Sequence, residues 1–182
     1  MNKLSYNEIL NLRKTVEQCK QTPRFPISVM LYNIRSMYNV GTVFRTCDAA
    51  NIKELILTGY TPHPPRKEIE KTSLGATDSV IWRYETDIIT AISKQKSQKE
   101  LIIAVEQTND SKAHSTLSTF GEPICLIFGN ELTGIDDKVL AFCDNAVEIQ
   151  MFGVKHSLNV GVAAGIAIYE AIKPYINKFF YI

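Results

Sequence analysis

Residues 123–135 read PICLIFGNELTGI. The first six form a short, continuous apolar run, which is typical of a strand buried on both faces of a parallel sheet. Gly129 and Gly134 follow, five positions apart, and permit a tight turn whose backbone can approach a ligand closely. An ordinary strand-to-helix turn needs only one glycine. The stretch alone therefore favours a ligand-binding turn and a purely structural turn about equally.

Apolar runs of the same kind alternate with helical patterns along the whole chain. Strands are predicted at residues 27–32, 54–58, 79–84, 101–105, 123–128 and 146–151, and helices at residues 3–20, 40–50, 86–94, 136–142 and 157–173. A proline-rich segment at residues 61–65 is predicted to be a loop. The pattern predicts an α/β domain with a parallel sheet covered by helices on both faces, over residues 26–182. Residues 1–25 are predicted to be an N-terminal helix and a linker.

The composition is that of an ordinary soluble protein and names no partner. Of 182 residues, 45% are hydrophobic, and 20 Lys and Arg balance 19 Asp and Glu, so no overall basicity indicates a nucleic-acid partner. Four cysteines and three histidines are scattered without metal-ligand spacing, so no metal is expected. Residues 157–172 are too short and too polar for a membrane span. The first ten residues lack the apolar core of a secretory signal, so reduced thiols and a cytoplasmic location are expected.

Three loops should meet at the carboxyl ends of the strands, where such sheets bind ligands. In the first, Asn39 is a plausible helix N-cap, and Arg45 could present its planar fork to a phosphate or carboxylate. From spacing alone, a plain surface arginine is the more economical interpretation. The second loop is the glycine turn described above.

The third loop precedes the last predicted helix. Ser157 is a natural N-cap, which would leave free amides for an anion or carbonyl, and Asn159 would lie in the first helical turn. Gly161 and Gly165 have the spacing of closely packed helices, against a neighbouring helix or a second subunit. His156 is more simply an exposed loop histidine than a general base.

Taken together, NIRSMYNVGTVFRTCDA, FGNELTGI and IQMFGVKHSLNVGVAAGI resemble the three motifs of the SpoU (TrmH-type) RNA 2′-O-ribose methyltransferases. The resemblance covers about residues 27–173. It implies a deep trefoil knot in the C-terminal part, a homodimer packed through the first and last helices, and S-adenosylmethionine as cofactor. By motif position it implies four cofactor contacts: Val105, Gly129, Ile149 and Leu158.

The reaction that the resemblance implies is attack of a ribose 2′-hydroxyl of tRNA or rRNA on the cofactor's methyl group. Arg45 matches the family arginine associated with that hydroxyl. Because a guanidinium is effectively always protonated, binding a phosphate and orienting the hydroxyl is the preferred role. Glu131 is the alternative proton acceptor. The remaining motif positions are matched by Asn39, Ser157 and Asn159.

RNA capture, on this interpretation, would use small local groups of cations and not a separate domain. The candidates are Arg13, Lys14, Lys20, Arg24 and Arg35, and the loop that carries His63, Arg66 and Lys67. The main rival function is a catalytically silent RNA-binding relative of the same fold. An unrelated nucleotide-binding protein would need phosphate-loop glycines that the chain lacks, and a base methyltransferase should have different motifs.

Overall fold

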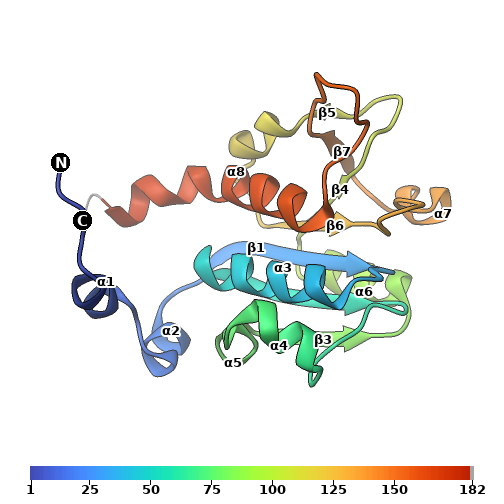
Figure 1. Cartoon of the computed structure of the whole chain (residues 1–182). Helices are drawn as coiled ribbons and strands as arrows, with labels where there is room; N and C mark the ends of the chain where they lie inside the picture. Colours follow the sequence, from blue (N-terminus) through green and yellow to red (C-terminus); the bar gives the residue numbers. More distant parts are fainter. Residues whose placement is uncertain (181–182) are drawn as a thin grey trace.

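Seven parallel strands form the sheet in the computed structural model, which describes residues 1–180 apart from the side chains of Lys20 and of residues 177–180. The strand order is β3-β2-β1-β6-β4-β7-β5. The strands are β1 (Phe25–Tyr32), β2 (Ile52–Thr58), β3 (Trp82–Glu85), β4 (Leu101–Val105), β5 (Lys112–Ala113), β6 (Ile124–Phe128) and β7 (Asn145–Glu148). The predicted parallel α/β sheet is confirmed, with β6 inserted between β1 and β4 (Figure 1).

Helices cover both faces of this sheet, as predicted. They are α1 (Tyr6–Leu12), α2 (Val16–Gln21), α3 (Met37–Ala49), α4 (Lys67–Ser73), α5 (Ala76–Ser79), α6 (Ile88–Ser97), α7 (Asp137–Leu140) and α8 (Val160–Phe180), with a 3-10 helix η1 (His114–Thr119). Alternate residues of β1 point to opposite faces. Val29 and Leu31 therefore pack with α3 and α8, whereas Met30 packs with α6 and α7. No helix in the described part of the chain is long and apolar enough to cross a membrane.

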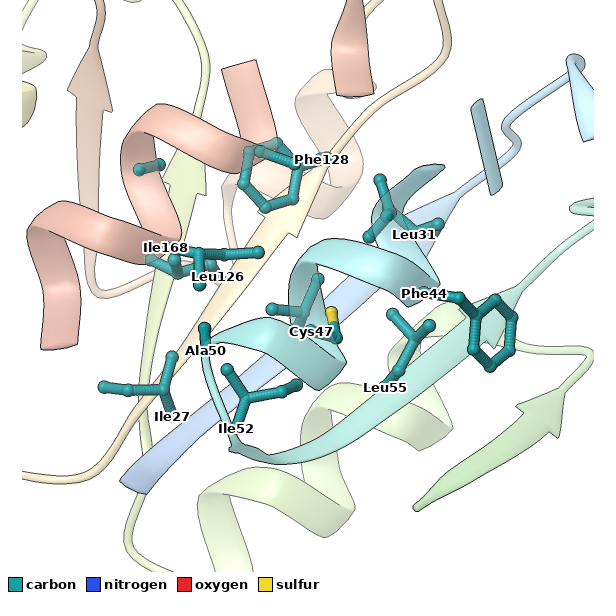
Figure 2. Close-up of a cluster of buried hydrophobic side chains, with 14 of the residues drawn as sticks. Ile27, Leu31, Phe44, Cys47, Ala50, Ile52, Leu55, Leu126, Phe128 and Ile168 are labelled. Atoms are coloured by element: carbon teal, nitrogen blue, oxygen red, sulfur yellow. The ribbon is translucent and has the colours of Figure 1, made fainter. Parts of the chain in front are cut away.

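The larger core lies between α3, α8 and the central strands (Figure 2). Leu31 of β1 and Phe128 of β6 face Cys47 of α3 and Ile168 of α8, and all are at most 2% exposed. This packing fixes α3 and α8 over the centre of the sheet. The loops that precede these helices are thereby brought to the carboxyl ends of β1, β6 and β7.

The predicted N-terminal helix at residues 3–20 is two helices. Ser5 and Glu8 form a capping box that starts α1, and Thr15 and Gln18 form a second one that starts α2. Arg13, between the helices, has an extended backbone. No residue of α1 is buried, so no tertiary packing opposes this break.

Other element boundaries differ from the predicted ones. The predicted strand at residues 79–84 is replaced by the end of α5 and by β3, and α4, β5 and η1 were not predicted. The predicted strand at residues 146–151 ends at Glu148. The last helix begins at Val160 and passes through Pro174, beyond which Tyr175 and Ile176 still pack against the core.

Candidate active site

A cavity of about 520 Å³ opens at the carboxyl ends of the central strands, between the loops that follow β4, β6 and β7. All four predicted cofactor contacts line it: Val105, Gly129, Ile149 and Leu158. Three further motif residues, Glu131, Ser157 and Asn159, lie on its wall as well. The structure thus brings together side chains from two of the three motifs at one cavity.

A chain of hydrogen bonds joins the first motif to the other two. The side-chain amide of Asn159 donates to Asn39 Oδ1 over 3.0 Å, and Asn39 Nδ2 donates to Glu131 Oε1 over 2.9 Å. These residues lie 120 and 92 positions apart in the sequence. The three motifs therefore form one connected polar structure.

Glu131 is the centre of this structure and is held as a carboxylate. The backbone N–H of Arg35 donates to its Oε2 over 2.8 Å, and that of Ser36 donates to its Oε1 over 3.1 Å. Burial acts to raise the pKa of Glu131, but the hydrogen bonds from Arg35, Asn39 and Ser36 outweigh it and lower the pKa below its ordinary value. A carboxylate with a lowered pKa and three donors is a weak proton acceptor.

The glycine turn is closed so tightly that both glycines are required. A Cβ atom on Gly129 would lie 2.4 Å from the backbone carbon of Gly134. Gly134 has a φ of +66°, and a Cβ there would meet the Glu106 carboxylate at 2.4 Å. Backbone bonds between Asn130 and Gly134 run in both directions, at 3.1 and 2.9 Å. The backbone entering the turn and the backbone leaving it are therefore in direct contact on the cavity wall.

Glu106 is a site residue that the sequence analysis missed. Its Oε2 accepts the N–H of Ile135 over 3.0 Å, which ties the loop after β4 to the glycine turn. It also lines the cavity. The available signal was an acidic side chain directly after a buried strand, at the edge of the sheet where the other loops meet.

Two predicted helix caps are wrong. The N-cap of α3 is Ser36, whose hydroxyl accepts the N–H of Asn39 over 3.3 Å, and Asn39 lies inside the first turn. At α8, Asn159 precedes the first helical residue, and its Oδ1 accepts the N–H of Gly161 over 2.9 Å. Ser157 lies upstream in the loop and is exposed. Asn159 is therefore the capping side chain that Ser157 was expected to be.

Arg45 is exposed on α3, and it is not among the residues that line the cavity. Its side chain makes no hydrogen bond or ion pair with the described residues. Asn39 therefore belongs to the hydrogen-bonded structure of the site, whereas the guanidinium of Arg45 is exposed and has no partner among the described residues. No group of three metal-ligating side chains occurs in the part of the chain that the structure describes.

Comparison with known proteins agrees with this geometry. The sequence profile of the SpoU rRNA Methylase family matches residues 26–169. The tRNA (guanosine(18)-2′-O)-methyltransferase of Thermus thermophilus is 28% identical over 159 residues, which cover 87% of this chain and 80% of that protein. The Escherichia coli protein of the same name is 26% identical, covering 86% and 67%.

Solved structures agree as well. The Aquifex aeolicus TrmH/SpoU tRNA modifying enzyme superposes with a TM-score of 0.80 at 25% identity, covering 91% of this chain and 85% of that one. An AdoMet-bound rRNA methyltransferase from Sinorhizobium meliloti gives a TM-score of 0.76 at 25% identity, covering 85% and 59%. Because the profile spans most of the chain and the three motifs are joined by hydrogen bonds beside one cavity, the chain belongs to the SpoU rRNA Methylase family.

Proposed function

We propose that this chain is an S-adenosylmethionine-dependent methyltransferase that modifies a ribose 2′-hydroxyl of tRNA. The observation that carries the proposal is the hydrogen-bonded chain from Asn159 through Asn39 to Glu131, at the mouth of a cavity lined by the expected cofactor contacts. A silent family member would have no need to keep this polar structure intact. We therefore favour an active enzyme over the catalytically silent relative.

The cavity fits the cofactor in size and in charge. Its volume of about 520 Å³ lies within the usual range for small-molecule sites. Among the described residues its lining includes Glu106, Glu131 and Glu148 and neither lysine nor arginine, which suits a ligand that carries a positive sulfonium and an ammonium group. The apolar side chains of Val105, Ile149 and Leu158 suit its adenine ring.

The bound cofactor supplies an electrophilic methyl group, so the protein's main tasks are alignment and the handling of one proton. We assign Arg45 to binding a phosphate and orienting the hydroxyl, because its guanidinium is exposed and free of partners among the described residues. We assign Glu131 to positioning, since its oxygens already accept three hydrogen bonds. Ser157, on the cavity wall, is a further polar contact for the ribose.

tRNA is our preferred substrate over rRNA. Several relatives that align with most of this chain are named tRNA (guanosine(18)-2′-O)-methyltransferases, although the family profile itself is named for rRNA. We extend the relatives' specificity only to the class of RNA.

We also propose a homodimer, a C-terminal trefoil knot and a cytoplasmic location. The stripe of Val162 and Tyr169 on α8 is about half exposed, which suits a second copy of the chain. Gly161 already allows close packing within the chain, because a Cβ there would lie 3.1 Å from Thr42 of α3; a Cβ on Gly165 would meet nothing within 4 Å.

The insertion of β6 between β1 and β4, and the return of α8 to β1, support the knot. Four free cysteines suit a reducing compartment.

We further divide the chain into residues 1–25, the N-terminal segment, and residues 26–182, the methyltransferase domain. The absence of any buried residue in α1 supports this division.

In the deciding experiment, the purified chain and methyl-labelled S-adenosylmethionine are incubated with unmodified tRNA in one reaction and with unmodified rRNA in another. Label in tRNA, mapped to a single 2′-O-methyl group, is the expected result. Label in rRNA alone would show that the substrate is rRNA and not tRNA. Cofactor binding without transfer to any cellular RNA would establish the silent relative instead.

A further inference from the structure

Tyr60 is an exposed aromatic residue that is fixed at both ends. It is 62% exposed, yet its hydroxyl accepts a hydrogen bond from Asn130 Nδ2 over 2.7 Å. Its backbone N–H donates to Asn33 Oδ1 over 3.1 Å. Gly59, just before it, has a φ of +65°, and a Cβ there would lie 1.9 Å from the same Asn33 oxygen. The ring is therefore held rigidly at the surface with much of its area free.

Two further exposed aromatic side chains lie beside this anchored turn. Tyr84 donates its hydroxyl hydrogen to the carbonyl of Gly59 over 2.6 Å and is 40% exposed. The ring of His63 contacts that of Tyr84 at an interplanar angle of 41°, with 4.7 Å between the ring centroids. His63 also stacks on Trp82 at 6.4 Å and an interplanar angle of 26°. We call Tyr60, His63 and Tyr84 the aromatic platform.

Three exposed cations lie on the segments that carry or adjoin the aromatic platform. Arg35, Arg66 and Lys67 are exposed, and none of their side chains makes a hydrogen bond or ion pair with the described residues. Ile34, next to Arg35, donates its N–H to the hydroxyl of Thr61, which places this arginine's backbone near the turn of Tyr60. The nearby acid Glu85 is already paired with Lys94 and Arg83. Aromatic faces bordered by unpaired cations are the usual means of holding single-stranded nucleic acid.

The aromatic platform is connected directly to the cavity. Asn130, which binds the Tyr60 hydroxyl, lines the cavity and immediately precedes Glu131. Its Oδ1 accepts the N–H groups of Leu132 and Thr133 at 2.8 and 3.1 Å, so one buried side chain sets both the glycine turn and the position of the Tyr60 ring. A nucleotide at the cavity mouth would have its neighbour within reach of that ring.

We infer that the aromatic platform stacks an unpaired base of the RNA substrate, next to the nucleotide that is methylated. The inference rests on the proposed function, and it adds a recognition requirement that the motif residues do not supply. Stacking depends on the ring of Tyr60, whereas the hydrogen bond from Asn130 only positions it. It also requires the substrate to present at least one unstacked base beside its target, as a loop does and a regular duplex does not.

The test measures equilibrium binding of a tRNA transcript to wild-type protein, to Tyr60→Leu and to Tyr60→Phe. We expect Tyr60→Leu to weaken RNA binding about tenfold, the usual effect of losing one base stack, and Tyr60→Phe to stay within about twofold of wild type. Affinity for S-adenosylmethionine should be unchanged in both, which shows that the cavity is intact. Equal weakening in both variants would mean that the hydroxyl bond matters and not the ring, and would overturn the inference.

A second arm removes the base instead of the ring. Transcripts with an abasic nucleotide on either side of the methylated position are bound to wild type and to Tyr60→Leu. At one of the two positions the lesion should weaken wild-type binding about tenfold and leave Tyr60→Leu nearly unaffected, because each change removes the same stack. If the loss of affinity caused by Tyr60→Leu and the loss caused by the abasic nucleotide multiply at both flanking positions, neither flanking base stacks on Tyr60.

Binding is measured apart from methyl transfer, so the two proposals can fail separately. If the wild-type protein transfers no methyl group but its RNA binding still depends on the Tyr60 ring, only the proposed activity is wrong. If the protein is active and Tyr60→Leu binds RNA as wild type does, only the proposed stacking on the aromatic platform is wrong. The emission of Trp82, the single tryptophan of the chain, gives an independent signal for RNA binding beside His63.

Discussion

Glu131 is the residue on which the candidate site depends most. Glutamine at this position could keep its oxygen for the donors of Ser36 and Asn39, but its N–H₂ group would then face the backbone N–H of Arg35. We expect Glu131→Gln to lower the free energy of unfolding at neutral pH by about 1–3 kcal/mol, as for a polar group left with the wrong partner. Misalignment of the loop should reduce methyl transfer about 100-fold. Urea unfolding and single-turnover transfer measure the two effects, and wild-type transfer in this variant would contradict the positioning role.

The lowered pKa of Glu131 also predicts a pH dependence of stability. Its hydrogen bonds hold the folded-state pKa below the ordinary value of 4.5, so its contribution is complete above that pH. The contribution is lost as the pH falls through the lower, folded-state pKa. The gap in unfolding free energy between wild type and Glu131→Gln should therefore be constant near neutrality and should shrink below about pH 4.5. A gap that widens on acidification would show that the pKa is raised.

Arg45 is expected to matter for methyl transfer and not for stability. Because its side chain is exposed and has no partner among the described residues, Arg45→Ala should change stability by less than about 0.5 kcal/mol. It should abolish methyl transfer and leave the affinity for S-adenosylmethionine unchanged. Arg45→Lys should recover only part of the activity, since an ammonium cannot form the bidentate fork. Full transfer by Arg45→Ala would remove the assignment.

The motif residues could be found from the sequence, but their local roles could not. Asn39 and Ser157 are each a good capping residue near an expected helix start, so the sequence predicts a helix cap at both positions. The structure gives those roles to Ser36 and Asn159, which frees Asn39 to bridge Glu131 and Asn159. Such a bridge joins residues about a hundred positions apart, and no local propensity encodes it.

At the scale of elements, the residue before β4 is tied to β2 by an ion pair whose acidic partner is buried. Lys53 Nζ lies 2.5 Å from Glu100 Oε1; the Glu100 side chain is fully buried, and that of Lys53 is 38% exposed. Lys53→Met would leave that carboxylate without its cation, and we expect a loss of about 2 kcal/mol in urea unfolding. The matched control is Lys94→Met, which removes a more exposed pair with Glu85 and should cost less than about 1 kcal/mol. Equal losses in the two variants would contradict the structural role of the Lys53–Glu100 pair.

Among the strands, the sequence analysis places best those that are buried on both faces. The strand at residues 101–105 was predicted at its observed bounds, since all its neighbours in the sheet are parallel strands and both faces are covered. The two-residue strand β5 and the 3-10 helix η1 carry no such periodic signal, and they depend on pairing with β7 and packing against α8. Tertiary contacts, not propensity, decide these short elements.

At the scale of the whole molecule, strand type was predictable and strand order was not. A continuous apolar run indicates a buried parallel strand, but nothing in Ile124–Phe128 itself indicates that it pairs with both β1 and β4. That placement brings the loop after β6 beside the loop after β1. Glu131 thereby reaches Arg35 and Ser36, so the candidate site is a product of the topology.

The exposed face of α8 leads to the last prediction, on assembly. Val162 and Tyr169 are 52% and 47% exposed and lie two helical turns apart, so they form one apolar stripe. Between them, a Cβ added to Gly165 would meet nothing within 4 Å, which leaves room for a partner helix to approach. We expect the wild-type chain to sediment as a dimer and Val162→Glu to sediment as a monomer, because the new charge would have to be buried in the interface. Ile81→Glu is the control, since Ile81 is 55% exposed beside the edge strand β3 and away from α8, and it should remain dimeric. A dimeric Val162→Glu would place the interface elsewhere, and a monomeric wild type would exclude the homodimer.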